Sequence, residues 1–115
     1  MSYVDGMVCA VPTENKQAYV EHARKFSALL KEYGAANWLE AWGDDVPTGK
    51  VTDFHRAVAA KEGETIVFSW ITWPDKETHA TGWAKIMEDP RMAEMKMPFD
   101  GQRLIYGRFA AILEA

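Results

Sequence analysis

The segment of residues 65–73 constrains the fold more than any other part of the sequence. Its β-branched and aromatic side chains favour a strand, and they are Ile66, Val67, Phe68, Trp70, Ile71 and Trp73. Pro74 ends the strand. Because successive side chains of a strand point to opposite faces, this one needs apolar cover on both faces. We therefore expect it to lie in a sheet that is buried on two sides.

Four further segments have strand patterns, and they cover residues 3–11, 36–43, 53–60 and 103–113. Gly63 marks a short hairpin turn between the strands at 53–60 and 65–73. Residues 44–50 form a turn-rich loop that holds the acidic pair Asp44 and Asp45. Asp100 and Gly101 form a tight turn before the last strand, with the Asp100 side chain serving that turn.

Helix signals separate these strands. Thr13 is suited to cap a helix that ends at Gly34. The apolar stripe of that helix consists of Tyr19, Ala23, Phe26, Leu30 and Tyr33. Asp75 caps a second helix that extends to about residue 88, and Asp89 with Pro90 begins a short third helix.

The expected order is therefore β-α-β-β-β-α-β within a single domain over residues 1–115. Without one strand of the middle hairpin, this is the ferredoxin-like βαββαβ arrangement of the α+β class. Two helices cover only one face of such an antiparallel sheet. The other face is too apolar and aromatic to remain in water, so we expect two sheets to pack face to face in a homodimer.

Charge and composition exclude several classes of partner. The net charge is −4, and Lys and Arg are scattered rather than clustered. This argues against binding to nucleic acid or to an anionic membrane surface. Cys9 is the only cysteine and lies in an apolar run, so we expect a buried thiol and no internal disulfide. No signal-peptide pattern and no run of 18 apolar residues is present, which favours a cytoplasmic protein.

Six ordered motifs carry a resemblance to a known family: YVDG at 3–6, WGDDVP at 42–47, KVTDF at 50–54, VFSW at 67–70, DPRM at 89–92 and MPFDG at 97–101. Together they span nearly the whole chain and resemble the YbaA-like family of bacterial proteins of unknown function. The resemblance implies a dimeric α+β barrel, in which two ferredoxin-like protomers pack sheet to sheet. That superfamily includes cofactor-free monooxygenases, haem-degrading enzymes, isomerases and binding modules, so the fold alone does not define the activity.

Strand alternation predicts which side chains share the barrel interior. If the small residues Val4, Gly6, Val8 and Ala10 pack under the helices, the opposite face holds Asp5, Glu40, Trp42, Arg56, Trp70, Tyr106 and Arg108. Arg103 lies on the face opposite to Tyr106 and is placed to clamp a ligand carboxylate or the partner chain.

Two interpretations of this interior set stay open. In the first, the charged groups pair with one another and only fix the register and the dimer geometry. In the second, they line a pocket for a small aromatic or carbonyl ligand. Glu40 or Asp5 then acts as a general base, Tyr106 or an arginine stabilises an enolate-like oxygen, and the tryptophans hold the ring. A cofactor-free oxygenase or isomerase would use such a site.

Other classes of function have less support in the sequence. His22, His55 and His79 lack the spacing of metal ligands, so we expect no metal and no cofactor. His22 is expected to face solvent. A non-catalytic interaction or stress-response module is the alternative to a small-molecule-binding dimer, and it predicts an exposed apolar patch without a cavity. RNA binding would need a basic stripe that this sequence lacks.

Overall fold

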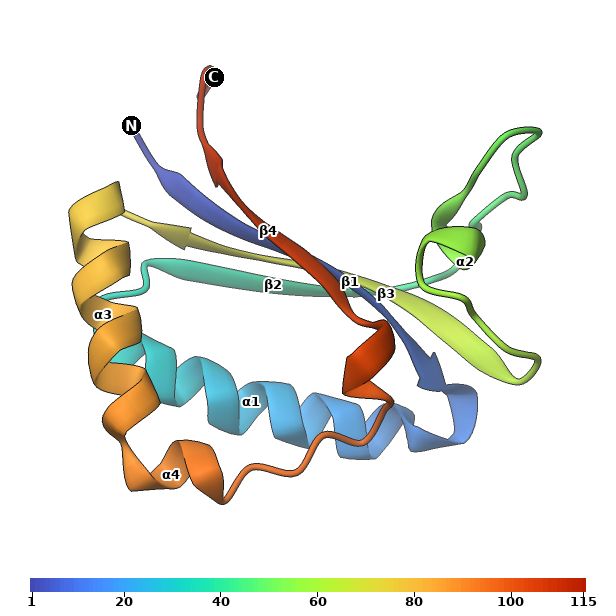
Figure 1. The fold of residues 1–115 in the computed structure, drawn as a ribbon, viewed down its shortest axis with the longest axis horizontal. Helices are drawn as coiled ribbons and strands as arrows, with labels where there is room; N and C mark the ends of the chain where they lie inside the picture. Colours follow the sequence, from blue (N-terminus) through green and yellow to red (C-terminus); the bar gives the residue numbers. More distant parts are fainter.

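The computed structural model describes residues 1–115 and places a four-stranded sheet above a layer of helices (Figure 1). The strands are β1 (Tyr3–Pro12), β2 (Asn37–Trp42), β3 (Glu64–Trp73) and β4 (Ile105–Ala110). They pair antiparallel in the order β2-β3-β1-β4. Helices α1 (Lys16–Glu32) and α3 (Lys76–Glu88) pack on one face of this sheet. The expected α+β class is confirmed, and the strands and main helices follow the ferredoxin-like order β-α-β-β-α-β without the fifth strand that was expected.

The helix ends follow the sequence signals with one exception. Asp75 accepts a hydrogen bond from the Thr78 amide, as expected for the cap of α3. Asp89 caps the short helix α4 (Pro90–Ala93) in the same way. Gly34 follows α1 with φ of 113°, the left-handed conformation that glycine adopts readily. The predicted Thr13 cap is wrong, because a 3₁₀ turn, η1 (Thr13–Asn15), precedes α1 and the Thr13 hydroxyl bonds that of Thr65.

The predicted strand at residues 53–60 is also wrong. This segment forms the short helix α2 (Phe54–Ala57), and no strand of the sheet pairs with it. Asp53 accounts for the difference, since its carboxylate accepts hydrogen bonds from the backbone amides of Arg56 at 2.8 Å and Gly49 at 3.1 Å. A side chain that satisfies the first turn of a helix competes with strand pairing. The extra hairpin strand is therefore absent.

The end of the chain differs from the prediction in its bounds. The predicted strand at 103–113 is limited to β4, and Arg103 lies in a 3₁₀ turn, η2 (Gly101–Arg103), rather than in a strand. Asp100 serves this turn as expected, because its carboxylate accepts a hydrogen bond from the Gln102 amide. Alternation along a strand consequently says nothing about the direction of the Arg103 side chain.

The core lies between the sheet and the helices. Leu29 and Leu30 of α1, Ile71 and Trp73 of β3 and Ile86 of α3 are almost completely buried in one cluster. A second cluster next to it holds Cys9, Val11, Tyr19, Ala23 and Val67. Full burial of one large apolar side chain stabilises a fold by about 1.5–3 kcal/mol, so these contacts hold α1 and α3 against the sheet.

The opposite face of the sheet is covered only at one end. Val58, which follows α2, packs on Val8, Ala10 and Ile66. The rest of this face is open, and its exposed large side chains are Leu39, Phe68, Trp70, Ile105 and Phe109. None of the helices has the length and the apolar character needed to cross a membrane.

Candidate functional site

Asp5 is a buried carboxylate at the junction of β1, β3 and α3. Its Oδ2 accepts hydrogen bonds from the indole Nε1 of Trp73 at 2.9 Å and of Trp83 at 3.0 Å. Its Oδ1 lies 2.9 Å from Nε2 of His79, which donates to it. Three N–H donors thus replace the water that this carboxylate loses. The arrangement joins two strands to one helix.

Glu40 is a second carboxylate on the same, helix-covered face. The Tyr19 hydroxyl donates to its Oε1 at 2.6 Å, and Nε1 of Trp38 donates to its Oε2 at 2.7 Å. Burial raises the pKa of Glu40, while these hydrogen bonds act in the opposite direction. Burial and then the Glu40 charge also raise the pKa of the Tyr19 hydroxyl.

Cys9 lies close to this pair, in the cluster that also contains Tyr19. Burial, with the Glu40 carboxylate as the second cause, raises the pKa of its thiol to about 12. The thiolate is the nucleophilic form of cysteine, so this side chain is a buried apolar group and not a nucleophile. Its burial agrees with the expectation from the sequence.

The structure divides the predicted interior set between both faces of the sheet and places one member outside it. The cross-strand pairs of Asp5 with Ile71 and of Glu40 with Ser69 put both carboxylates on the helix-covered face. Trp42 lies on the same face, where its ring is 6.5 Å from that of Tyr19. Trp70 pairs with Gly6 on the open face. The prediction that Asp5, Glu40 and Trp70 share one face is therefore wrong.

The remaining predicted residues lie at the periphery. Arg56 belongs to α2 and is within 3.6 Å of the Asp53 carboxylate. Tyr106 and Arg108 lie on the edge strand β4, opposite Met7 and Asp5, and both side chains are exposed. Neither of them contacts Asp5 or Glu40 through a hydrogen bond. The acid–base site proposed from Asp5, Glu40, Tyr106 and an arginine is therefore not assembled in one pocket of the protomer.

The two faces were assigned in reverse because the sheet is apolar on both. Val4, Gly6, Val8 and Ala10 were expected under the helices, yet the helices cover the alternate residues Met7, Cys9 and Val11 instead. A Cβ atom on Gly6 would lie 3.2 Å from the Phe109 ring, and one on Gly107 would lie 3.1 Å from it. The two glycines therefore allow this ring to lie flat on the open face.

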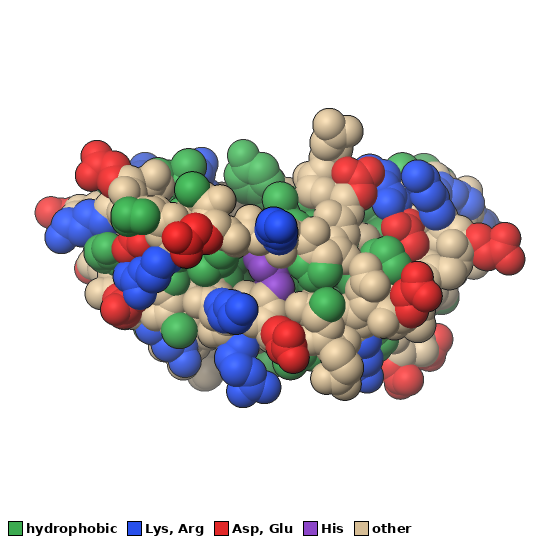
Figure 2. All heavy atoms as spheres, turned by 90° about the horizontal axis from the view of Figure 1, so that it is seen from below, with side chains coloured by type: hydrophobic (Ala, Val, Ile, Leu, Met, Phe, Trp, Pro, Cys, Tyr) green, Lys and Arg blue, Asp and Glu red, His purple; other side chains and the backbone are tan.

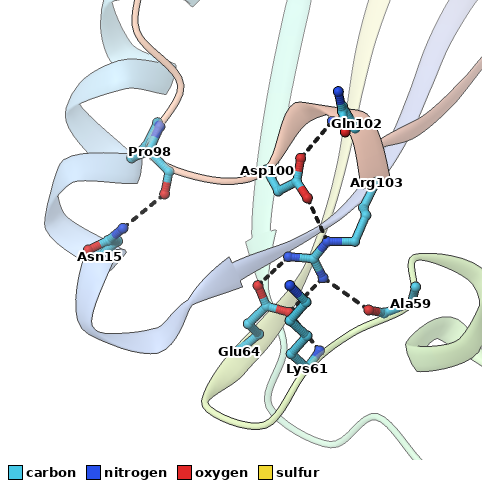
Figure 3. A network of polar contacts seen from close by, with 8 residues as sticks. All are labelled: Asn15, Ala59, Lys61, Glu64, Pro98, Asp100, Gln102 and Arg103. Carbon is cyan, nitrogen blue, oxygen red and sulfur yellow. Dashed lines mark hydrogen bonds and ion pairs between the residues drawn. The ribbon is translucent and has the colours of Figure 1, made fainter.

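Arg103 lies at the centre of a network of ion pairs and hydrogen bonds (Figure 3). Its guanidinium donates to both carboxylate oxygens of Glu64, at 2.7 and 2.6 Å, and to Asp100 at 3.0 Å. It also donates to the Ala59 carbonyl oxygen at 3.0 Å. These contacts lower the pKa of Glu64 to about 2. Every partner is within the chain, so Arg103 links η2 to the start of β3 and to the segment after α2.

The open face of the sheet contains a shallow groove of about 540 Å³. Its lining is apolar and aromatic except for two hydroxyl groups, and consists of Val4, Gly6, Met7, Val8, Phe68, Trp70, Thr72, Ile105, Tyr106, Gly107 and Phe109. The hydroxyl oxygen of Thr72 is buried and has no hydrogen-bond partner. The volume lies within the range of roughly 300–1,000 Å³ that is usual for ligand sites.

One charged side chain lies on the open face, that of Glu64 at the start of β3, and it is paired with Arg103. The other residues there are Val4, Gly6, Val8, Ala10 and Pro12 of β1, Asn37, Leu39 and Ala41 of β2, Ile66, Phe68, Trp70 and Thr72 of β3, and Ile105, Gly107 and Phe109 of β4. Apolar residues at nearly every second position of the four strands are the sequence signal for this face, and the strand pairing brings Thr72 and Phe109 to the same face as Trp70. No three His, Cys, Asp or Glu side chains are grouped closely enough to hold a metal ion.

Comparison with known proteins identifies the family. The model of a family described as "Protein of unknown function (DUF1428)" matches residues 2–101. "Uncharacterized protein YbaA" of Escherichia coli strain K12 is 53% identical over 116 residues, which cover 99% of each chain. The protein of the same name from Shigella flexneri gives the same values. These findings confirm the resemblance to the YbaA-like proteins, and the chain belongs to the DUF1428 family.

Proposed function

We propose that this protein acts as a homodimer in which two open sheet faces pack on each other and enclose a site for a small, mainly apolar ligand. The observation that carries the proposal is the open face itself, which is mainly apolar and holds a groove of about 540 Å³ with no charged residue in its lining. The proposal corresponds to the dimeric α+β barrel expected from the sequence, with two ferredoxin-like protomers.

A second copy of the chain is the occupant that this face suits best. A four-stranded face is about 19 Å wide, and its two central strands are about 34 Å long. That is of the order of the 800 Å² per partner that a stable interface buries. The chain carries a net charge of −4, so two copies repel each other. The one charged side chain of the open face, that of Glu64, is paired with Arg103, so that repulsion is not concentrated where the two sheets meet.

The groove supports binding rather than acid–base chemistry. Its lining offers aromatic rings but neither a carboxylate nor an imidazole. The carboxylates of Asp5 and Glu40 are on the other side of the sheet and are already hydrogen-bonded. A small aromatic molecule with one polar group fits the groove, since Trp70 and Phe68 supply ring contacts and the exposed Tyr106 supplies a hydroxyl group.

The experiment that tests the dimer is light scattering on the wild type and on two charge variants. Phe109→Asp puts a carboxylate on the open face, and Met87→Asp puts one on α3, where the methionine is similarly exposed. We expect twice the chain mass for the wild type and for Met87→Asp, and the chain mass for Phe109→Asp. A wild-type monomer at micromolar concentration would overturn the proposal.

Ligand uptake is tested separately, by thermal-shift measurements with indole, 2-naphthol and phenylacetone. A ligand that binds the folded protein raises its melting temperature as its occupancy increases. We expect a shift for the wild type and a smaller one for Trp70→Ala, whereas Trp42→Ala, on the helix-covered face, keeps the full shift. A dimer that none of these compounds stabilises would leave the face as an interface only and refute the ligand site.

A further inference from the structure

A second groove lies on the helix side of the molecule, far from the open sheet face. It has a volume of about 620 Å³ and runs between α1 and the segment of residues 91–98. Figure 2 shows this side of the protein, where a histidine ring lies in a hollow with Lys, Arg, Asp and Glu side chains around it. The groove shares no lining residue with the one on the open face.

One side of α1 forms the first wall of this groove. Ala18, His22, Lys25 and Leu29 recur at helical spacing and therefore project from the same side of the helix. His22 was expected to face solvent, but its ring is half-buried and lies 6.0 Å from the ring of Phe26. Neither ring nitrogen of His22 has a hydrogen-bond partner within the protein, and neither is a fully buried atom.

The charged groups of the groove include two lysines that are free to pair with an anion. Its titratable and charged groups are Glu21, His22 and Lys25 on α1, and Arg91, Glu94 and Lys96 on the other wall. The guanidinium of Arg91 is already paired with Asp89 and Glu32. Lys25 and Lys96 form no ion pair, so they are the cations available to a ligand. Lys25 and Lys96 equal Glu21 and Glu94 in number, and this balance suits a singly charged group better than a doubly charged phosphate.

Apolar side chains lie between the charged ones. Leu29 of α1 and Met95 and Pro98 of the other wall provide surface that a hydrocarbon group covers favourably. We propose that this groove binds a small organic carboxylate, whose charged group pairs with Lys25 and Lys96 and accepts a hydrogen bond from the His22 ring. The site is independent of the dimer and of the groove on the sheet.

Burial lowers the pKa of His22 from its ordinary value, so the ring is neutral at pH 7 in the empty groove. A bound carboxylate stabilises the charged imidazolium and therefore raises that pKa. By linkage, the affinity for the carboxylate increases as the pH falls through the pKa of His22. This coupling gives the proposal a readout that a passive surface groove does not produce.

The test is an NMR titration of the folded protein with benzoate and hexanoate at low ionic strength, with benzamide as the neutral control. We expect both carboxylates to shift the His22 ring resonance to saturation and to raise its pKa, whereas benzamide does neither. His22→Gln identifies the resonance by removing it. Ion pairs at exposed sites contribute up to about 1 kcal/mol, so Lys25→Gln or Lys96→Gln should weaken binding by up to about fivefold.

Lys31→Gln is the matched control, because Lys31 is an exposed lysine of α1 that does not line the groove. It should leave the affinity unchanged. Ligand concentrations up to about 10 mM detect a Kd of about 1 mM. Absence of any saturable shift at His22 in that range would overturn the proposal. Equal binding of benzamide, or an equal loss of affinity in Lys31→Gln and in both groove variants, would overturn it as well.

Discussion

Asp5 shows how a single carboxylate can organise an apolar interior. Three N–H donors from β3 and α3 surround it, and two of them belong to the large side chains Trp73 and Trp83. The indole rings therefore combine apolar contact with a polar group that needs an acceptor. The same carboxylate fixes the position of His79, whose ring packs edge-on against Tyr3 at 4.8 Å.

We predict that Asp5→Ala lowers the free energy of unfolding by about 3–5 kcal/mol, because it leaves three buried donors without an acceptor. Urea denaturation at one fixed protein concentration measures the effect. Asp44→Ala, in the loop before α2, is the control and should change the free energy by no more than about 0.5 kcal/mol. Equal effects of both substitutions would contradict this role of Asp5.

Glu64 and Arg103 predict a pH dependence of stability. Arg103 lowers the pKa of Glu64 from 4.5 to about 2, and it also lowers the pKa of Asp100. A carboxyl group with a lowered pKa stabilises the folded state fully above its unfolded pKa, and this contribution is lost as the pH falls through the folded pKa. The stabilisation should therefore disappear between about pH 4.5 and pH 2.

Arg103→Gln tests this dependence. We expect a lower urea midpoint than that of the wild type at pH 7, and a difference that shrinks as the pH falls from 5 to 2. Lys50→Gln, an exposed loop lysine, should follow the wild type at every pH. A difference between Arg103→Gln and the wild type that stays constant over this range would show that the ion pairs do not cause it.

At the scale of elements, Gly82 sets the distance between α3 and the sheet. A Cβ atom at this position would lie 2.6 Å from the Trp73 ring and 2.6 Å from the Tyr33 carbonyl oxygen. The contact is too short for any larger residue without movement of the helix or the ring. Alanine favours a helix over glycine by about 1 kcal/mol, so local preference and packing oppose each other here.

We predict that the clash with Trp73 outweighs the helix preference of alanine, so that Gly82→Ala lowers the free energy of unfolding by about 1–3 kcal/mol. Thr81→Ala, at the exposed neighbouring position of α3, should be neutral or slightly stabilising. Urea denaturation of both variants and of the wild type, under the same conditions, measures these changes in the free energy of unfolding. A stabilised Gly82→Ala protein would mean that α3 moves away from Trp73 at little cost.

The elements with strong local signals could be predicted from the sequence. The run of β-branched and aromatic residues in β3 and the caps Asp75 and Asp89 gave correct elements. The helix α2 has four residues and depends on one carboxylate, Asp53, so periodicity could not reveal it. The faces of the sheet could not be assigned from the sequence. Strand alternation divides the side chains between two faces, but it does not say which face the helices cover.

The candidate sites depend on contacts that no local pattern contains. His22 lies one helical turn from Lys25, but the groove exists only because residues 91–98 pass alongside α1. Trp70 was expected on one face with Asp5 and Glu40, yet its neighbours on the open face come from β1 and β4, at both ends of the chain. Asp5 and Glu40 were expected among arginines, whereas their observed partners are tryptophan, tyrosine and histidine.

At the scale of the whole molecule, the two faces of the sheet differ in how much apolar surface remains exposed for a second copy of the chain to bury. The helices bury one face, and α2 with its flanking loop covers only one end of the other (Figure 1). If two copies bury the remaining apolar surface, folding and association become one equilibrium. The melting temperature then rises with protein concentration, because unfolding releases two chains.

We predict a rise of about 3 °C for each tenfold increase in concentration, from an association term of about 1.4 kcal/mol and the unfolding entropy of two chains of this length. Scanning calorimetry over a hundredfold concentration range measures it. Phe109→Asp places a charge on the open face, so this variant should melt at a lower temperature that does not change with concentration. A concentration-independent melting temperature of the wild type would show that each protomer is stable alone, with its open face in water.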